Sequence, residues 1–407
     1  MEASNPPLAD LSSLEPWDVA PETKMIPEDQ YIDLEVVDIS QINLESLTST
    51  TSTLLSHAEA IDKAMRGLKK TGFIVVKGFG LTSEEISHQF ALGKFLNSSV
   101  PEEEKKTLHA AINEGSWAGY KTQGYYKRPD GGYDTTEHYD LYPYTALESR
   151  LPQIAKQYLP NIRQFIEHNH YHILPRLLAI ISLGLGLEHD ALWKLHHRGG
   201  SYEADHPLSG APKDNVDWVH TKDHLRYIIY HPVREEDREK KKYLSLPGHT
   251  DLGSVTFLYP QTIAGLQILT AEGEWKYVRH YPGQIVVGLG DSMEFITGGL
   301  LKAGPHRVKE PPEDQRHIDR PGMFYFVPFL AEVPLSPINH PAIYKKGGKD
   351  IFEEYYQHGG KPMLSNEWLV ERSKLVGKKR IEGDLDEFGQ KKSAMRMALE
   401  DISYRYM

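Results

Sequence analysis

The sequence contains no cysteine among its 407 residues. Disulfide bonds, thiolate nucleophiles and zinc sites built on thiolates all require cysteine, so each of them is excluded. A metal ion bound by this chain must therefore be held by nitrogen and oxygen atoms. In proteins such ligands come mainly from histidine and carboxylate side chains.

Long apolar runs, a signal segment and a basic excess are also missing. No run approaches the roughly 20 apolar residues that a membrane helix needs. Residues 1–24 are polar and lack the basic-then-apolar pattern of a secretory signal. The net charge of −11 argues against nucleic acid and anionic membranes as partners. We therefore expect a soluble, cytoplasmic protein, with no obligate protein partner evident.

Helical and strand patterns alternate in the N-terminal half. Apolar residues recur every three or four positions from residue 54 to residue 68, which predicts a helix. Residues 73–76 are short, apolar and β-branched, which is typical of a strand. Thr82 and Glu85 form a capping box, which predicts that a further helix begins there. Residues 152–187 are broadly helical, with breaks expected at prolines.

The second half has a different pattern, with short apolar runs separated by glycine, proline and aspartate. The runs are Leu225–Tyr230, Ser254–Leu258, Gly265–Leu269, Trp275–Val278, Gln284–Val287 and Met323–Val327. This spacing is typical of a β-sandwich or barrel. No internal repeat and no linker separates the halves, so we expect one compact unit in which helices brace a β core.

A candidate metal site lies in this β region. His249 and Asp251 are two residues apart, so on a strand both side chains leave the same face. A further imidazole from His306 would complete a triad of two histidines and one carboxylate. That triad leaves open positions on one side of the metal and suits non-haem Fe(II) acting with O2. The alternative is a turn or a solvated strand end, in which such pairs are common.

Arg320 favours the metal interpretation. Its guanidinium leads directly into an apolar strand, and burying it is costly unless it meets an anion. The planar fork of arginine suits a carboxylate in a bidentate pair. The alternative is an arginine that extends to solvent at the strand end. Arg316 is a competitor, but its polar neighbours indicate a loop.

Other histidines offer weaker metal patterns. His168, His170 and His172 point to different sides of a helix, so we expect them at the surface. His220 and His224 are four residues apart, but the glutamate of a metalloprotease motif is absent between them.

Two stretches have open interpretations. Residues 117–144 are rich in glycine and aromatic residues, and are interpreted either as turns packed on a core edge or as a substrate-facing wall. Residues 198–218 form a long irregular stretch that is interpreted as a lid. The charged run 234–242 is interpreted as a solvated loop.

The order of several motifs resembles a known family. The motifs are Gly72-Phe73 with the strand that follows, Leu225-Arg226 through Tyr230-His231-Pro232, His249-x-Asp251, Gly265-Leu266-Gln267-Ile268, Pro282-Gly283, Gly290-Asp291, His306-Arg307-Val308 and Arg320. Together they resemble the Fe(II)/2-oxoglutarate-dependent dioxygenases of the isopenicillin N synthase-like superfamily. The resemblance covers roughly residues 30–335.

The resemblance implies a fold that is mainly β with flanking α. Its core would be a double-stranded β-helix (jelly roll) with N-terminal and C-terminal helices. The expected organisation is a flexible tail at 1–30, an N-terminal helical and strand region at 31–215, the Fe(II)/2-oxoglutarate jelly-roll core at 216–335 and a C-terminal helical extension at 336–407.

The resemblance also implies an activity and its site. His249, Asp251 and His306 would bind Fe(II), while Arg320 and Tyr230 would hold the far carboxylate of the co-substrate 2-oxoglutarate. With O2, the enzyme would hydroxylate, desaturate or cyclise a small, hydrophobic specialised metabolite and release succinate and CO2.

Two positions depart from the family's pattern. Gly322 stands where the family has a serine, and Ile228 stands where an asparagine often helps to hold 2-oxoglutarate. Two alternatives follow: an iron oxidase of the same fold that does not use 2-oxoglutarate, and a catalytically silent jelly roll that binds a small ligand.

Overall fold

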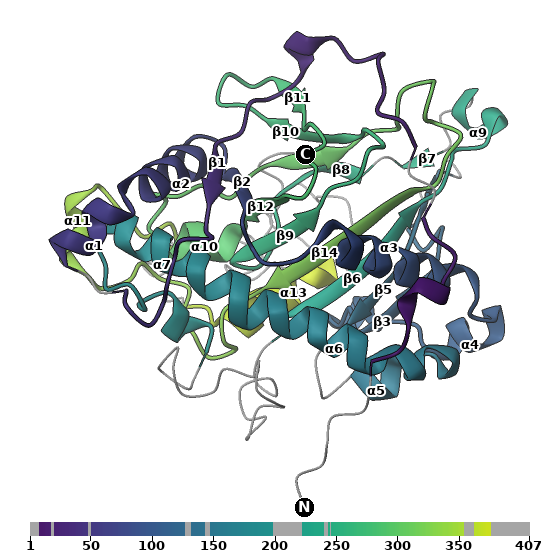
Figure 1. Ribbon diagram of the computed structural model, residues 1–407, viewed down its shortest axis with the longest axis horizontal. Helices are drawn as coiled ribbons and strands as arrows, with labels where there is room; N and C mark the ends of the chain where they lie inside the picture. The colour runs from purple at the N-terminus through teal and green to yellow at the C-terminus, as the bar shows by residue number, and fades with distance from the viewer. Residues whose placement is uncertain are drawn as a thin grey trace, which may run out of the picture.

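The computed structural model describes residues 8–17, 20–47, 50–126, 132–142, 147–197, 222–239, 243–244, 246–353 and 362–375. Within these residues the strands form a larger sheet of eight strands, a smaller sheet of four and a pair of short strands. Figure 1 shows the helices gathered along the larger sheet.

The larger sheet has the order β1-β2-β12-β9-β14-β6-β5-β3. Its strands are β1 (Val36–Asp38), β2 (Phe73–Lys77), β12 (Ile285–Leu289), β9 (Val255–Tyr259), β14 (Arg320–Val327), β6 (His224–Tyr230), β5 (Thr136–Leu141) and β3 (Gly119–Lys121). The smaller sheet holds β11 (Trp275–Tyr277), β10 (Leu266–Leu269), β13 (His306–Val308) and β8 (Leu246–His249). The short pair joins β4 (Tyr133–Asp134) to β7 (Tyr243–Leu244).

All six apolar runs predicted as strands in the second half are strands. The predicted runs do not include β1, β3, β4, β5, β7, β8 and β13. Strands β5 and β3 extend the larger sheet. Tyr139 and Leu141 of β5 belong to the helix-side core, whereas His138 and Asp140 between them are polar and face the other side.

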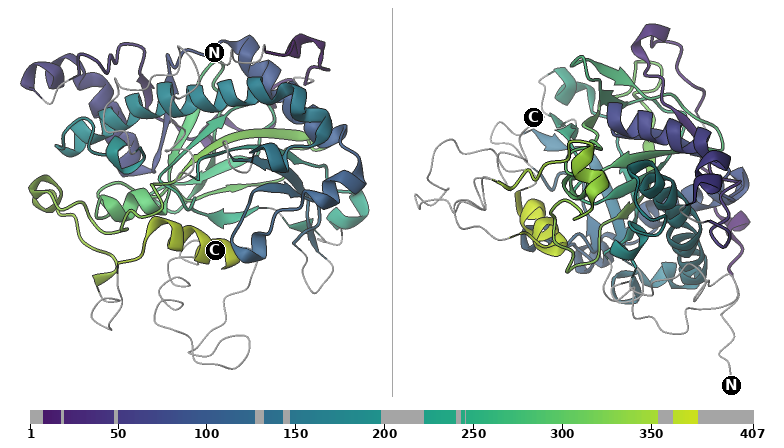
Figure 2. Two further views of the ribbon diagram at one scale, coloured as in Figure 1. Left: turned by 90° about the horizontal axis from the view of Figure 1, so that it is seen from below. Right: turned by 90° about the vertical axis from the view of Figure 1, so that its left-hand side faces the viewer.

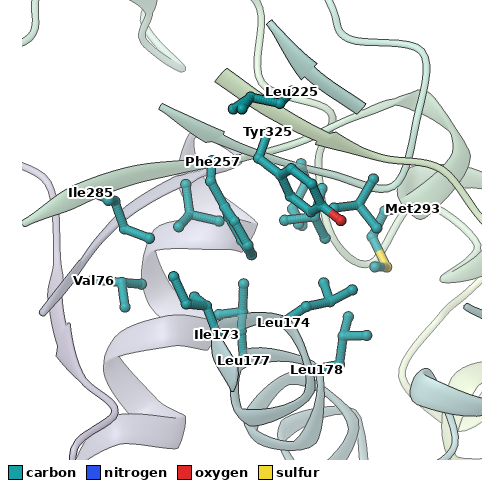
Figure 3. Close-up of a cluster of buried hydrophobic side chains, with 14 of the residues drawn as sticks. Val76, Ile173, Leu174, Leu177, Leu178, Leu225, Phe257, Ile285, Met293 and Tyr325 are labelled. Atoms are coloured by element: carbon teal, nitrogen blue, oxygen red, sulfur yellow. The ribbon is translucent and has the colours of Figure 1, made fainter. Parts of the chain in front are cut away.

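One face of the larger sheet packs against helices. Alternate residues of the strands, such as Phe257 and Tyr325, are fully buried there. Figure 3 shows both rings directed toward Leu174, Leu177 and Leu178 of α7 (Leu174–Leu185). Burying a large apolar side chain stabilises the fold by about 1.5–3 kcal/mol, so this face supplies most of the core.

The opposite, inner face of the larger sheet meets the smaller sheet. A separate apolar cluster joins Phe73, Val75 and Val286 of the larger sheet to Ile268 of the smaller one. Residues next to these in sequence, such as Ile74, belong to the helix-side core instead. The period of two along each strand thus divides the side chains between two cores, which is the arrangement of a jelly roll.

The helices follow the predicted pattern closely. The described helices are α1 (Thr51–Ser56), α2 (Ala58–Lys70), α3 (Ser83–Ser98), α4 (Glu102–Thr107), α5 (Leu147–Arg150), α6 (Leu159–Glu167), α7, α9 (Glu235–Glu239), α10 (Asp291–Ile296), α11 (Pro341–Lys345) and α13 (Ser365–Leu375). The capping box of Thr82 and Glu85 is present at the start of α3. Pro160 lies in the first turn of α6, where the missing N–H leaves no bond unmade, while Pro175 follows the π-helical turn His168–Ile173 that joins α6 to α7.

The prediction for the middle histidines is wrong. His170 is 1% exposed and its Nδ1 lies 2.7 Å from Asp223 Oδ2, because the π-helical turn His168–Ile173 directs it inward. His168 and His172 stack on each other with ring centroids 4.6 Å apart.

Two loop predictions also differ from the structure. In the predicted tail, Leu11 and Leu14 are buried, and Asn161 exchanges hydrogen bonds with the backbone of Ala9. The charged run begins with helix α9, and Arg238 there forms an ion pair with Glu310. The predicted lid at 198–218 lies outside the described residues.

Helix α13 lies on the other side of the strands from α6 and α7 (Figure 2, left). Trp368 of α13 is fully buried, and its Nε1 donates a hydrogen bond to the carbonyl oxygen of Leu252 (3.1 Å). The C-terminal segment is thereby attached to the loop that follows Asp251. None of the described helices is long and apolar enough to cross a bilayer.

Candidate metal centre

His249, Asp251 and His306 come together in the structure. His249 Nε2 lies 3.9 Å from Asp251 Oδ1, and His306 Nε2 lies 3.7 Å from the same oxygen. One ligand atom from each residue falls within 4.8 Å of the others. In the described part of the chain no other group of histidine and carboxylate side chains has this geometry. The three atoms are close enough for one metal ion to bind all of them.

Strand pairing brings the two histidines together. β13 runs antiparallel to β8, and His306 is the direct cross-strand partner of His249. Side chains at such positions leave the same face of the sheet, so the two rings lie 4.3 Å apart. Asp251 follows His249 by two residues, just past the strand end.

A close backbone contact sets the position of Asp251. The amide of Asp291 donates to the carbonyl oxygen of Asp251 (2.8 Å), so the start of α10 lies against this loop. A Cβ at Gly290 would lie 2.7 Å from that oxygen and 2.4 Å from the carbonyl oxygen of Gly253. Only glycine permits this approach.

Further hydrogen bonds orient two members of the set. His306 Nδ1 lies 3.0 Å from the carbonyl oxygen of Gly304, a partner to which it can only donate, so Nε2 is left as the ligand atom. Thr256 Oγ1 donates to Asp251 Oδ2 (2.7 Å), so Oδ1 remains available. Sequence reasoning missed Thr256, because nothing but its place at the start of β9 distinguishes it.

Arg320 lies on the same inner face and is 5% exposed. Its Nε donates to the carbonyl oxygen of Ile263 (3.2 Å), and its guanidinium lies 5.0 Å from the ring centroid of Tyr230. Burial lowers the pKa of Arg320, and the described residues include no carboxylate paired with it. The alternative interpretation, an arginine that extends to solvent at the strand end, is therefore excluded.

Tyr230 is the cross-strand partner of Arg320. Burial raises the pKa of its phenol, and the Asp251 carboxylate acts in the same direction. Tyr230 therefore lies within electrostatic range of the metal set and can donate its proton in a hydrogen bond. Arg316, the competitor, instead forms an ion pair with Glu313 near the surface.

The described residues fit a dicarboxylate co-substrate beside a divalent metal. Arg320 Nη1 is buried and has no hydrogen-bond partner among the described residues. An unsatisfied buried donor on a cation is costly, so a carboxylate at this point would relieve it. The His-Asp-His donor set suits Fe(II) and leaves positions open for such a ligand.

The two departures from the family's pattern lie opposite each other. Gly322 of β14 is the cross-strand partner of Ile228 of β6. A Cβ at Gly322 would lie 2.7 Å from both Ile228 Cγ2 and Phe324 Cε2, so these two side chains occupy the space that a side chain at 322 would need. Where the family's pattern has a serine and an asparagine, this chain therefore has one apolar contact.

The other residues that the sequence singled out lie on both faces of the larger sheet. His224 lies on the inner face of β6 and stacks on Phe326 with centroids 4.9 Å apart, while His220 lies outside the described residues. In the aromatic stretch, Tyr120 and Tyr139 are buried with centroids 4.9 Å apart. Trp117 instead contacts the guanidinium of Arg226 on the inner face. The interpretation of the stretch as a substrate-facing wall stays a prediction.

Comparison with known proteins places this geometry in a family. Residues 223–327 match the model of the 2OG-Fe(II) oxygenase superfamily, and this range contains all three metal-set residues and Arg320. Residues 34–163 match the model described as non-haem dioxygenase in morphine synthesis N-terminal. The chain belongs to the 2OG-Fe(II) oxygenase superfamily. Its cofactors are accordingly Fe(II) and 2-oxoglutarate, and its activity is an oxygenation that depends on both.

Relatives of this oxygenase occur in fungi. A UPF0676 protein of Schizosaccharomyces pombe is 28% identical over 299 residues, covering 72% of this chain and 83% of the relative. A 2-oxoglutarate-dependent dioxygenase of Gibberella zeae is 33% identical over 160 residues, covering 39% of this chain and 41% of the relative. Among solved structures, a full-length Neurospora crassa protein in complex with alpha-KG has a TM-score of 0.65 at 19% identity, covering 86% of this chain and 97% of that one. The jelly-roll fold is therefore confirmed.

Proposed function

We propose that His249, Asp251 and His306 hold the Fe(II) of this oxygenase and that Arg320 and Tyr230 hold the far carboxylate of 2-oxoglutarate. The observation that carries the assignment is the buried Nη1 of Arg320, which lacks a partner among the described residues. This atom lies on the same face as the metal set. One ligand could therefore bind the metal and accept a hydrogen bond from Nη1. The division into regions 1–30, 31–215, 216–335 and 336–407 is part of the same proposal.

When bound, Fe(II) and 2-oxoglutarate supply the oxidising chemistry with O2, and the co-substrate leaves as succinate and CO2. The chain's own residues position and protect that chemistry. The hydrogen bonds to Gly304 and from Thr256 hold the imidazole and the carboxylate in one orientation. The edge of the Phe73 ring packs on His306 with centroids 5.5 Å apart, which excludes water from that side.

We further propose that the substrate is a small, hydrophobic, ring-bearing molecule of specialised metabolism and that the protein acts in the cytoplasm. Aromatic side chains on the inner face, Trp117 and Phe326 among them, support this class. Relatives named for ring-bearing molecules include a flavonol synthase/flavanone 3-hydroxylase of Petunia hybrida, 24% identical. The Neurospora crassa protein has also been solved in complex with alpha-KG and thymine.

The ligand assignment is tested with His249→Ala and Asp251→Ala, and with His317→Ala as a control at a histidine outside the metal set. We expect both ligand variants to lose Fe(II) binding and substrate-dependent succinate formation while their circular dichroism stays unchanged. The control should retain all three properties. Full succinate formation in either ligand variant would refute the assignment.

The co-substrate assignment needs a separate measurement. Anaerobic addition of Fe(II) and 2-oxoglutarate should produce a visible charge-transfer band in the wild-type protein. Arg320→Gln should raise the Kd of 2-oxoglutarate by roughly tenfold or more, because a hydrogen-bonded charge pair is lost. An unchanged Kd would exclude Arg320 from the co-substrate site.

A further inference from the structure

The N-terminal segment 20–33, which we call the strap, crosses one end of the jelly roll. Its Tyr31 forms a bridge to Tyr277 of β11, and the amide of Ile32 donates to the carbonyl oxygen of Tyr277 (2.9 Å). Figure 1 shows this part of the purple trace beside β11. The two family models match residues 34–163 and 223–327, so the strap precedes both ranges.

The strap is attached at the end of the jelly roll that carries Arg320. The loop 309–319 runs from the end of β13 to Arg320 at the start of β14, whereas His306 of the metal set lies at the other end of β13. Thr23 Oγ1 of the strap donates to the carboxylate of Asp314 in this loop (2.8 Å). The strap therefore closes the Arg320 end and leaves the metal end uncovered by this contact.

Gln315 joins the strap to the loop 260–265, which connects β9 to β10. Its side chain is buried, at 2% exposed. The Nε2 atom donates to the carbonyl oxygens of Pro21 (2.7 Å) and Thr262 (3.1 Å), and the Oε1 atom accepts from the amide of Ala264 (2.9 Å). One buried side chain thus bonds to the strap once and to the loop twice.

A neutral amide matches these three partners of Gln315. Two carbonyl oxygens need donors and one N–H needs an acceptor, and the side chain of glutamine supplies both kinds of group. A carboxylate or an apolar side chain of the same length would leave buried backbone groups without partners, which is costly.

The loop residue between the two bonds to Gln315 is Ile263, which contacts Arg320. The carbonyl oxygen of Ile263 accepts from Arg320 Nε (3.2 Å) and also from Gln261 Nε2 (3.0 Å). The loop passes so close that a Cβ at Gly265 would lie 3.3 Å from Arg320 Nε. Because Gln315 holds the residues on either side of Ile263, the position of this carbonyl depends on Gln315.

The bond at Nε sets the direction of the whole guanidinium of Arg320. Its three nitrogen atoms lie in one plane, so holding Nε–H on the Ile263 carbonyl also fixes where Nη1 points. Nη1 is the buried donor that has no partner among the described residues. A displaced Ile263 carbonyl would therefore misdirect the donor assigned to the co-substrate carboxylate.

We propose that Gln315 is a positioning residue for the 2-oxoglutarate site, because it ties the strap to the loop 260–265 and so holds the carbonyl oxygen that orients Arg320. The inference rests on the proposed function, since it requires that Arg320 binds the far carboxylate of the co-substrate. Gln315 acts through Ile263 and Arg320 rather than on the co-substrate itself. The alternative is a purely structural role, in which the loss of Gln315 affects folding and no ligand selectively.

Two ligands separate these roles. Anaerobic titration of the full-length Fe(II) protein, followed through the visible band, measures the Kd of 2-oxoglutarate and that of pyruvate. Pyruvate has the same 2-oxo acid group but lacks the far carboxylate, so its binding does not need Arg320. Gln315→Met removes the three hydrogen bonds at a similar side-chain volume. We expect it to raise the Kd of 2-oxoglutarate roughly tenfold and to leave that of pyruvate unchanged. An unchanged Kd of 2-oxoglutarate, or an equal loss for both ligands, overturns the proposal.

Gln89→Met is the matched control. Gln89 is also buried, at 5% exposed, and accepts a hydrogen bond from the Tyr227 hydroxyl (2.5 Å) on the helix side of the larger sheet. The control removes a buried amide on the opposite face from Arg320, so both Kd values should stay at the wild-type level. A control that weakens 2-oxoglutarate binding as much as Gln315→Met does would reduce the effect to lost stability and refute the positioning role.

The route through Arg320 is tested by combining two variants. In an Arg320→Gln background, Gln315→Met should have no further effect on the Kd of 2-oxoglutarate, because the two residues act on the same contact. The full effect of Gln315→Met in that background would contradict the proposed route.

Thr262→Val keeps the test decisive if Gln315→Met does not fold. The Thr262 hydroxyl donates to the carbonyl oxygen of Ala20 in the strap, and its removal leaves Gln315 in place. We expect the Kd of 2-oxoglutarate to rise by roughly three- to tenfold and that of pyruvate to stay unchanged. Wild-type affinity for 2-oxoglutarate in this variant would overturn the proposal.

The two proposals fail in different ways. Absence of the visible band with 2-oxoglutarate in the wild type, or an unchanged Kd in Arg320→Gln, counts against the proposed function. When the band and the Arg320→Gln effect are both present, a Gln315→Met protein that behaves like the control counts against Gln315 alone.

Discussion

Arg320 illustrates how one residue can indicate a ligand. Its guanidinium is buried and its Nε donates to the carbonyl oxygen of Ile263, yet Nη1 has no hydrogen-bond partner among the described residues. Folding does not place a cation in that situation for stability, because desolvation is not offset by an anion. The carboxylate of the proposed 2-oxoglutarate site would offset that cost. Gly322 and Ile228 lie on the same two strands and illustrate the opposite case. The family's pattern has polar side chains at these two positions, whereas here a glycine packs against an isoleucine.

We predict that Gly322→Ser alone destabilises the fold by about 1–3 kcal/mol, because its Cβ would lie 2.7 Å from both Ile228 Cγ2 and Phe324 Cε2. Gly322→Ser combined with Ile228→Asn should recover part of that stability, since the contact with Phe324 remains, and lower the Kd of 2-oxoglutarate by roughly tenfold. Urea denaturation and titration of the visible band measure the two effects. Tighter binding by the single variant without loss of stability would show that the two positions are independent.

At the scale of the elements, the ends of three strands are joined by one histidine. His231 follows β6, its Nε2 lies 3.2 Å from Glu137 of β5, and its Nδ1 lies 3.0 Å from Asp319 just before β14. Burial alone would lower the pKa of His231, but Asp319 and Glu137 raise it to about 9. The histidine is therefore charged at neutral pH and holds the strand ends beside Tyr230 and Arg320.

This raised pKa predicts a pH dependence of stability. Because the folded pKa of His231 lies above the unfolded value of about 6.5, its contribution is fully present below that value and is lost as pH rises through about 9. The difference in unfolding free energy between the wild type and His231→Gln should therefore shrink between pH 7 and pH 10. Urea denaturation at several pH values measures it, and a constant difference would contradict the ion-pair account.

At the scale of the whole molecule, the C-terminal segment is part of the oxygenase core. Trp368 packs edge-on against Phe295 of α10 with centroids 4.9 Å apart and donates to the carbonyl oxygen of Leu252. Arg372, one turn further along α13, lies 3.6 Å from Asp291 Oδ2 at the start of α10. Segments far apart in the sequence thus converge on the loop that carries Asp251.

We predict that Trp368→Ala destabilises the protein by about 3–5 kcal/mol, because it leaves a cavity at this junction. Trp368→Phe keeps most of the ring packing and should cost about 1 kcal/mol for the lost hydrogen bond. The Fe(II) affinity should fall in the order wild type, Trp368→Phe, Trp368→Ala as the Leu252 loop loosens. Chemical denaturation measures the free energies of unfolding, and anaerobic titration with Fe(II) measures the affinities. Equal free energies of unfolding for all three proteins would exclude a stabilising role for Trp368.

Local patterns were sufficient for much of the fold. The capping box at Thr82, the helical spacing from residue 54 and the six apolar runs all depend on interactions between near neighbours in sequence. The inward turn of His170 was missed because its partner, Asp223, lies far away along the chain. Strand β5 was missed because only Tyr139 and Leu141 of it are apolar core residues, while His138 and Asp140 on the inner face are polar, so the apolar pattern is too short to stand out.

The sequence by itself determined the types of chemistry available. Without cysteine a metal needs nitrogen and oxygen ligands, and His249 and Asp251 share a face because side chains on a strand repeat every two residues. Only the tertiary structure decided which distant residues join them. His306 reaches His249, and Asp140 reaches Arg226, through the register of antiparallel strands. That register depends on how whole sheets bury their apolar faces, which no local pattern of residues specifies.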